Sequence, residues 1–443
     1  MHATKFHVNS EGQQNRPISI TRDFFRLLKG LGYLFVYPLR QIQPIKFFIT
    51  TDTLRSRGLP LTMAIVIPNT NFSLRFSLTY LKVFGLWPAV GIAGWKKILF
   101  YTYSLFIFML ILGTYIAIQL VDLWQNWGNL SLMTSIAFVL CTNLVHCVKI
   151  FNLLVRRRRI EHIIDRNNYV LKNATGQQKI DIIRSCNRGT TLHLMTFLTL
   201  TTVTLIGFAV GPALESQNLQ LPLQAWYPYD WSKSPAYELT YLHQICAIYA
   251  AACLNISKDM VVVSLLAQCR CRFKLLGYDL KTLCLDMSPG TMQRMSQEHD
   301  LMVQARLNEC IREHQDILDS LNELQRCFSE PTFAQFTVSL VIICVTAFQM
   351  ASIATYLLNM MEQVFIYCYE GNELSENISR CAYEWPWYTC SVRLRRSTLI
   401  LMTRCGRTAM LTAGGFTTLS LDSFMRILKA SYTFFTVLRQ VSE

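Results

Sequence analysis

Charged residues are scarce in this chain of 443 residues, at 16% of the total, whereas soluble domains carry roughly 25%. Apolar residues make up 51%. This balance argues against an ordinary soluble protein and favours a membrane protein. The first 30 residues contain no apolar core segment, so we expect no cleavable secretory signal peptide and an insertion that begins with the first membrane helix.

Enzyme motifs are also missing. The chain has no GxSxG, HExxH or GxxxxGK sequence. Cys269 and Cys271 lack a second Cys or His pair at zinc spacing, which favours structural thiols over a metal site. The 15 cysteines lie in apolar runs or in segments expected to be cytosolic, so we predict that they are reduced. We therefore predict no enzyme, no cofactor and no metal.

Basic residues are in excess, with a formal net charge of +14. They gather at the ends of apolar runs, as in the sequence from Arg156 to Arg159. Next to a membrane span such a run sets orientation in the bilayer, so we predict no nucleic-acid partner.

Apolar runs long enough to cross a membrane recur along the chain. A spanning helix needs about 20 residues, and the run from Pro331 to Tyr369 is about twice that length, so it must fold back, with a hinge expected near Ala351–Thr355. Seven spans are predicted: Ile98–Val121, Gly128–Val148, Gly189–Leu214, Leu239–Ser257 continued to about Gln268, two helices within Pro331–Tyr369, and Leu411–Leu438.

The distribution of Lys and Arg orients these spans. Thirteen basic residues against three acidic ones precede Ile98, and residues 156–188 hold nine against three. The loops expected on the other side of the membrane contain a single basic residue, Lys233. By the positive-inside rule the N-terminus is cytosolic and the C-terminus extracellular. This orientation is the inverse of a G protein-coupled receptor, and neither predicted external loop has a cysteine for the disulfide of that class.

The last predicted span has one polar face. At about 100° per residue, six polar side chains fall within roughly 40° of one direction: Asp422, Arg426, Lys429, Thr433, Thr436 and Gln440. Val437 lies beside this face. The opposite side of the helix presents apolar side chains, namely Phe424, Leu428, Phe434, Phe435 and Leu438. Several copies of such a helix could line a water-filled pore that Val437 closes by dewetting. The same face could instead hydrogen-bond to neighbouring helices of one subunit, and the stripe alone leaves both readings open.

The C-terminal sequence resembles that of insect odorant receptors. The resemblance lies in the residues from Tyr367 to Leu374, in Ala382–Trp385 with Trp387 and Tyr388, and from Leu399 through Ala413–Phe416 to Tyr432. Gly85–Pro88 and the pair His314 and Leu318 are also similar to that family. The similarity extends over about Phe76 to Gln440, whereas the extension before Phe76 is longer than the family usually carries.

The resemblance implies a tetrameric, ligand-gated, non-selective cation channel with the last helix of each subunit around a central pore. It places the hydrophobic gate at Val437 and the pore-lining glutamine at Gln440, on or beside the face that carries Thr433 and Thr436. It also implies a cytosolic anchor domain that contains a helix at about Tyr383–Thr408.

The expected all-α chain then has six parts. They are a cytosolic N-terminal region with its atypical extension (1–97), spans one to four (98–268), a cytosolic helical loop (269–330), spans five and six (331–369), a cytosolic anchor region (370–410) and the pore-lining helix with the C-terminus (411–443).

The short second cytosolic loop and the ending Ser431–Gln440 resemble tuning subunits. Tuning subunits work with a shared co-receptor, which implies a mixed tetramer in the plasma membrane of an olfactory neuron dendrite. A homomeric channel like the gustatory receptors is the alternative, although their usual Gln-Phe ending is absent.

The predicted ligand is a small, mostly apolar volatile molecule. We expect it between the external halves of spans two, three, four and six, because aromatic linings suit such molecules. The candidate contacts are Phe138, Phe208, Tyr241, His243 and Tyr356, and core packing is the alternative role for each.

Overall fold

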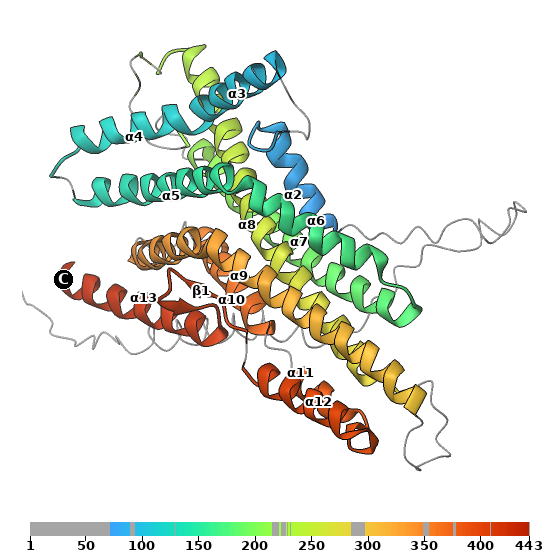
Figure 1. Ribbon diagram of the computed structural model, residues 1–443. Helices are drawn as coiled ribbons and strands as arrows, with labels where there is room; N and C mark the ends of the chain where they lie inside the picture. The colour runs from blue at the N-terminus through green and yellow to red at the C-terminus, as the bar shows by residue number, and fades with distance from the viewer. Residues whose placement is uncertain are drawn as a thin grey trace, which may run out of the picture. The chain divides into compact units, whose positions relative to one another are not determined.

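The computed structural model describes residues 71–88, 94–128, 130–214, 221–222, 227, 229–230, 232–284, 297–348, 354–374, 378–407 and 409–442. This part is almost entirely helical (Figure 1). It begins with α2 (Phe72–Val83), α3 (Trp95–Phe108), the π-helical η2 (Met109–Gly113), α4 (Thr114–Gln125), α5 (Leu130–Val155), α6 (Arg157–Asn173), α7 (Gln177–Leu214) and α8 (Ala236–Lys281). It continues with α9 (Gln297–Phe348), α10 (Ala354–Glu373), α11 (Ile378–Glu384), the 3-10 helix η3 (Trp387–Thr389), α12 (Val392–Cys405), β1 (Thr412–Ala413), β2 (Thr417–Thr418) and α13 (Leu421–Ser442). The predicted N-terminal extension lies outside the described residues.

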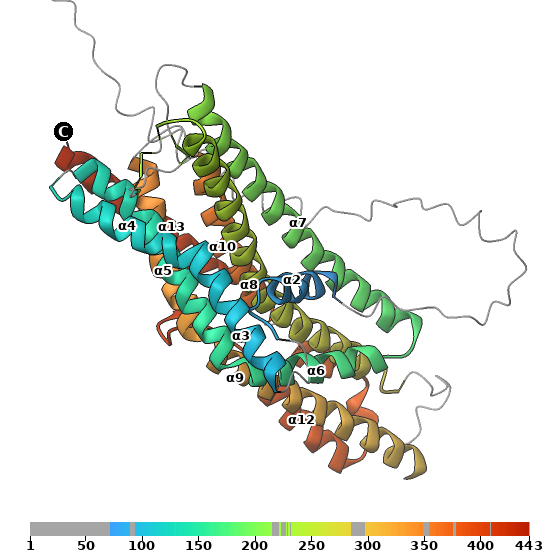
Figure 2. The same cartoon turned by 90° about the horizontal axis from the view of Figure 1, so that it is seen from above.

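Two long helices, α8 and α9, organise the bundle. They contain 46 and 52 residues, so at 1.5 Å per residue they extend about 69 and 78 Å, more than twice the hydrocarbon thickness of a bilayer. α8 contacts α2, α5, α7, α9, α10 and α11, and its residues 253–273 are all buried. The shorter α2 lies across α7 and α8 (Figure 2).

Apolar side chains on the outside of the bundle indicate a membrane environment. α3 has no buried residue, and its exposed side chains include Ile98, Leu99 and Phe106. A soluble protein of this size rarely leaves such a continuous apolar surface in water. Lipid is the solvent that stabilises it.

The length and composition of single helices identify fewer spans than the seven predicted. Within the described residues, Gln177–Gly207 and α8 are each long and apolar enough to cross a membrane, and Val139–Val155 qualifies together with α6 as a pair bent by 71°. The first predicted span is divided into α3, η2 and α4, α9 joins a charged half to an apolar half, and α13 is amphipathic. The seven spans and their orientation therefore remain predictions.

The long run that was expected to fold back consists of two helices. α9 ends at Phe348, α10 begins at Ala354, and the two helices are in contact. The hinge expected near Ala351–Thr355 falls mainly outside the described residues. α9 continues through Pro331, where the predicted fifth span began.

The predicted start of the last helix, at Leu411, is wrong. Residues 412–418 form an antiparallel hairpin, and α13 begins only at Leu421. The turn contains Gly414 and Gly415, with φ of 61° and 78°, a conformation that no helix interior accommodates. A glycine pair is a turn signal, and the apolar residues around it concealed it.

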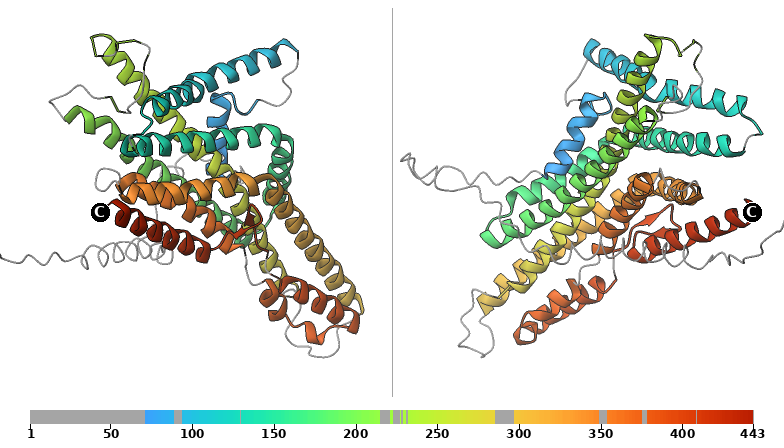
Figure 3. Two further views of the ribbon diagram at one scale, coloured as in Figure 1. Left: turned by 90° about the vertical axis from the view of Figure 1, so that its left-hand side faces the viewer. Right: turned by 180° about the vertical axis from the view of Figure 1, so that it is seen from behind.

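The expected helix from Tyr383 to Thr408 is also divided. α11 ends at Glu384 and α12 begins at Val392, with η3 between them. Pro386 accounts for the break, because a proline disfavours helical backbone at the residue before it. α11 and α12 lie at the opposite end of the bundle from the C-terminal end of α13 (Figure 3).

Candidate functional site: a buried cavity and an exposed polar helix face

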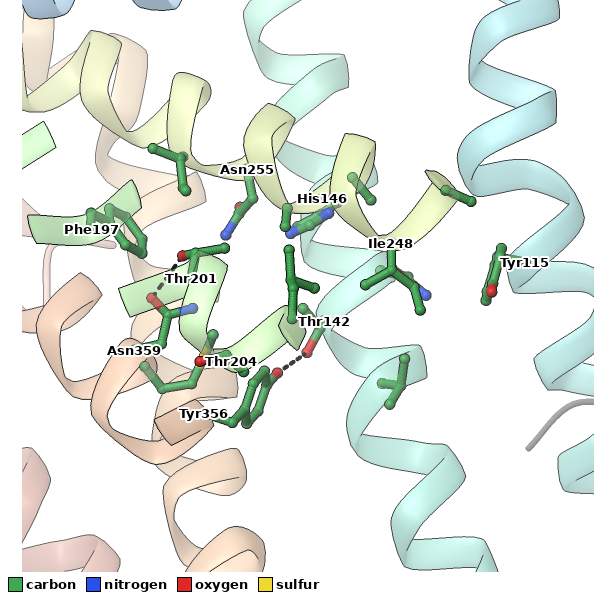
Figure 4. Close-up of a pocket in the computed structure, with 18 residues that line it drawn as sticks. Tyr115, Thr142, His146, Phe197, Thr201, Thr204, Ile248, Asn255, Tyr356 and Asn359 are labelled. Carbon is green, nitrogen blue, oxygen red and sulfur yellow. Dashed lines mark hydrogen bonds between the residues drawn. The ribbon is translucent and has the colours of Figure 1, made fainter. Parts of the chain in front are cut away.

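A cavity of about 140 Å³ lies between α4, α5, α7, α8 and α10 (Figure 4). On α8 its wall is built from small side chains, Ala247, Ala251 and Ala252. These alanines leave space that larger side chains would fill. The remaining lining residues are Tyr115, Val139, Thr142, Asn143, His146, Phe197, Thr201, Thr204, Leu205, Ile248, Asn255, Ile256, Tyr356, Asn359 and Met360.

Most polar groups in the lining bond to the protein itself. The hydroxyl oxygens of Thr142 and Tyr356 are 3.4 Å apart, and the Thr201 hydroxyl donates to Asn359 over 3.1 Å. His146 differs, because it is buried and neither of its ring nitrogens has a hydrogen-bond partner among the described residues. The cavity is thus apolar with one uncommitted imidazole in its wall.

The five predicted ligand contacts fall in different places. Tyr356 lines the cavity. Phe138 and Phe208 lie in α5 and α7, but their side chains are outside the described part of the chain. Tyr241 packs against Tyr237 with ring centroids 5.7 Å apart, and His243 is exposed. Neither belongs to the lining of this cavity.

Sequence reasoning missed most of the lining because it looked for aromatic residues. Polar side chains within apolar runs were the signal that was present, namely Thr142, His146, Asn255 and Asn359. The alanines of α8 gave no signal, because small residues in a membrane helix equally indicate close helix packing.

A buried polar network adjoins the cavity at Asn255. The Lys149 ammonium donates to the Asn255 side chain at 3.3 Å and to the Asp259 carboxylate at 2.6 Å. Tyr367 donates to Asp259 over 2.9 Å, and Gln363 donates to the second carboxylate oxygen. The network joins α5, α8 and α10 beside the cavity.

The network reaches the helix that supports α13. Gln335 lies on α9, and its side chain donates to Gln363 on α10 and to Ser339 on α9, in both cases over 2.8 Å. α9 packs directly against α13, where the Ser431 hydroxyl donates to the Leu340 carbonyl. A continuous set of contacts therefore connects the cavity with α13.

α13 leaves its polar face uncovered. The side chains of Thr433, Val437 and Gln440 are exposed, Thr436 is partly exposed, and the charged residues Asp422, Arg426 and Lys429 are exposed as well. The opposite face, with Phe424, Ile427, Leu428 and Ser431, is buried against α9 and α10. Within the described part of the chain, the predicted face is thus mostly exposed.

Phe434 corrects the sequence analysis of this helix. It was placed on the packed side, yet 53% of it is exposed. At about 100° per residue it lies roughly 120° from Asp422, at the edge of the packed face rather than within it. The side chain of Leu438 lies outside the described residues.

The region predicted to be the anchor packs against the far ends of α8 and α9. Lys281 on α8 forms an ion pair of 2.9 Å with Glu384, and Cys405 Sγ lies 3.5 Å from His314 Nε2 on α9. Burial raises the pKa of the Cys405 thiol to about 11. Burial, and then the charge of Arg404, lowers the pKa of His314. α12 also exposes Val392, Leu399 and Ile400.

Comparisons with known proteins place this arrangement in a family. The family model for the 7tm Odorant receptor matches residues 129–432. Odorant receptor Or1 of Anopheles gambiae is 25% identical over 83% of this chain and 95% of its own length. Odorant receptor 13a of Drosophila melanogaster is 23% identical over 84% and 97%.

The fold is similar to a solved structure. The insect olfactory receptor OR5 from Machilis hrabei, in complex with eugenol, superposes with a TM-score of 0.69, covering 83% of this chain and 97% of that chain at 17% identity. Together with the family match, this likeness confirms the resemblance found in the sequence. The chain belongs to the 7tm Odorant receptor family, a family of ligand-gated channels and not of enzymes.

Proposed function

We propose that this chain is a tuning subunit that binds a small volatile ligand in the cavity between α4, α5, α7, α8 and α10. In this proposal it assembles with a co-receptor subunit into a mixed tetramer in the plasma membrane of a sensory neuron. The four copies of the last helix surround a pore for cations. Val437 closes this pore, and Thr433, Thr436 and Gln440 line it.

The observation that carries the proposal is the exposed polar face of α13. The Thr433 and Thr436 hydroxyls donate to carbonyls of their own helix, but a membrane helix that turns an amide and charges towards lipid is unfavourable, because lipid satisfies none of these groups. Water in a central pore satisfies them all. The packed opposite face supports this reading, since α9 and α10 hold α13 in one orientation.

Exposed apolar residues on α12 support assembly. Val392, Leu399 and Ile400 lie in the part predicted to be cytosolic, where lipid does not cover them. Contact with neighbouring subunits would remove this apolar surface from water.

A cysteine pair tests the pore assignment. Thr433 and Ser431 are hydroxyl residues two positions apart, the first exposed and the second buried against α9. In channels formed with a co-receptor, a charged thiol reagent should block the current of the Thr433→Cys variant and leave that of Ser431→Cys unchanged. Equal insensitivity of both variants at full surface expression would refute the pore assignment.

The same expression system tests the assembly. Without a co-receptor the chain should give little ligand-evoked current. Large ligand-evoked currents from this chain alone would instead make it a homomeric channel. Epitope tags at the two ends test the orientation, because only the C-terminal tag should be accessible on intact cells.

A further inference from the structure

The proposed role of the cavity as an odorant site does not explain one feature of its wall, the imidazole of His146. His146 is only 5% exposed and lines the cavity from α5. Neither ring nitrogen has a partner among the described residues. An imidazole carries at least one N–H donor in every protonation state, and a buried donor without a partner costs free energy. The ring is therefore poised to donate a hydrogen bond to an occupant of the cavity.

Other polar side chains around the cavity are already engaged. Thr204 donates to the carbonyl of Leu200 within its own helix, and Asn143 donates to Gln119 over 3.0 Å. Asn255 accepts from Lys149. Tyr115 is the exception, since its hydroxyl also lacks a partner in the described part of the chain. It lies at the α4 edge of the cavity, with Ile248 between it and His146 (Figure 4).

The N–H group of the ring selects the polarity of that occupant. The Lys149 ammonium near His146 is paired with the Asp259 carboxylate at 2.6 Å, so the two charges largely compensate each other beside the ring. Lys258 is buried and has no hydrogen-bond partner among the described residues, a location in which a full ammonium charge is costly. The N–H dipole of His146 therefore sets the local polarity, and it stabilises the negative end of a ligand dipole.

We propose that His146 donates a hydrogen bond to an oxygen of the ligand, so that the receptor selects small apolar molecules with one carbonyl or ether oxygen over hydrocarbons of the same shape. This inference rests on the proposed ligand site. His146 acts as a specificity residue within it, and the alanines of α8 receive the apolar body.

Matched pairs of probes test the selectivity. Small ketones and methyl ethers are paired with the hydrocarbons in which carbon replaces the oxygen, for example acetophenone with α-methylstyrene. In channels formed with a co-receptor, we expect the oxygenated members to activate at concentrations about ten-fold lower, the value of one neutral hydrogen bond. His146→Leu should abolish this preference, whereas His146→Gln, which keeps an N–H donor, should retain part of it.

Control variants distinguish the proposal that the cavity is the ligand site from the proposal that His146 is its hydrogen-bond donor. His243→Leu makes the same change at an exposed position outside this cavity and should leave the preference intact. Ala251→Phe fills the cavity, so unchanged responses to all probes would refute the ligand site itself. If Ala251→Phe abolishes the responses but His146→Leu keeps the preference, only the inference about His146 falls. The inference about His146 is also refuted if the wild-type channel does not prefer the oxygenated probes across the panel. If only Tyr115→Phe loses the preference, Tyr115 rather than His146 is the hydrogen-bond donor to the ligand.

Discussion

The ammonium of Lys149 lies 2.6 Å from the carboxylate of Asp259, and both side chains are almost completely buried, at 6% and 2% exposure. Burying two charges is favourable only when their remaining hydrogen-bonding capacity is used. Asn255, Gln363 and Tyr367 provide those additional bonds. The pair therefore fixes α5, α8 and α10 relative to one another beside the cavity that they line.

Loss of Asp259 should destabilise the receptor strongly. In Asp259→Ala the Lys149 ammonium remains buried without its carboxylate, a change that typically costs about 3–5 kcal/mol. We expect loss of surface expression and a lower melting temperature in detergent. The double variant Lys149→Met with Asp259→Leu removes both charges and should recover part of the loss.

The matched control for this prediction is Asp181→Ala. Asp181 forms an exposed ion pair with Arg184 on α7, and such pairs contribute about 0–1 kcal/mol. Its surface expression should equal that of the wild type. The prediction is wrong if Asp259→Ala melts at the wild-type temperature, or if the double variant is no better than Asp259→Ala.

This ion pair marks a limit of sequence reasoning. The sequence shows Lys149 and Asp259 as charges at the edges of apolar runs, but they are separated by 110 positions. Their pairing depends on how α5 and α8 cross, which no local pattern encodes. The polar face of α13, by contrast, can be predicted from the local sequence, because helical periodicity alone assigns Thr433 and Gln440 to one side.

Acidic pH should weaken the packing of α9 on α12 through His314. Its folded-state pKa is lowered by burial and by Arg404, whereas the unfolded value is about 6.5. As the pH falls below 6.5 the unfolded chain takes up a proton first, so stability is lost until the folded-state pKa is reached. In detergent the melting temperature should therefore fall less steeply between pH 7 and pH 5 in His314→Gln than in the wild type.

His162→Gln provides the comparison for that measurement. His162 is exposed on α6, so His162→Gln makes the same chemical change without altering a buried contact. Parallel profiles for the wild type and His314→Gln would contradict the assigned role of His314.

The hairpin before α13 should be more sensitive to substitution at Gly414 than at Gly415. A Cβ on Gly414 would lie 2.7 Å from the Phe333 ring, whereas a Cβ on Gly415 meets no atom within 4 Å. Both residues have positive φ, so alanine strains the backbone at either position. Gly414→Ala should therefore reduce thermal stability and surface expression more than Gly415→Ala does. Equal effects of the two substitutions would show that the Phe333 ring moves away from the added Cβ without loss of stability.

The same hairpin shows why the sequence analysis misplaced the start of the last helix. Apolar residues around Gly414 and Gly415 favoured a continuous span, while the glycine pair favoured a turn. The turn prevails because its backbone is also held from outside, by a hydrogen bond of 3.0 Å from the Gly414 amide to the Ser329 carbonyl on α9. Such a distant contact cannot be inferred from the local sequence.

The exposed face of α13 leads to the prediction about gating. Val437 is half-exposed beside the polar face of α13 and one turn before Gln440, so a ring that includes it should form a dry constriction. Val437→Ser should wet this constriction and raise the basal current, whereas Gln440→Ala should change conductance or ion preference more than ligand sensitivity. In the proposed mixed tetramer, co-receptor subunits would dilute both effects. Phe424→Ala is the control, because Phe424 packs against Phe365 on the buried face and its loss should lower expression without changing selectivity. If both pore variants leave basal current, conductance and selectivity unchanged in channels shown to contain this subunit, α13 of this chain does not line the pore.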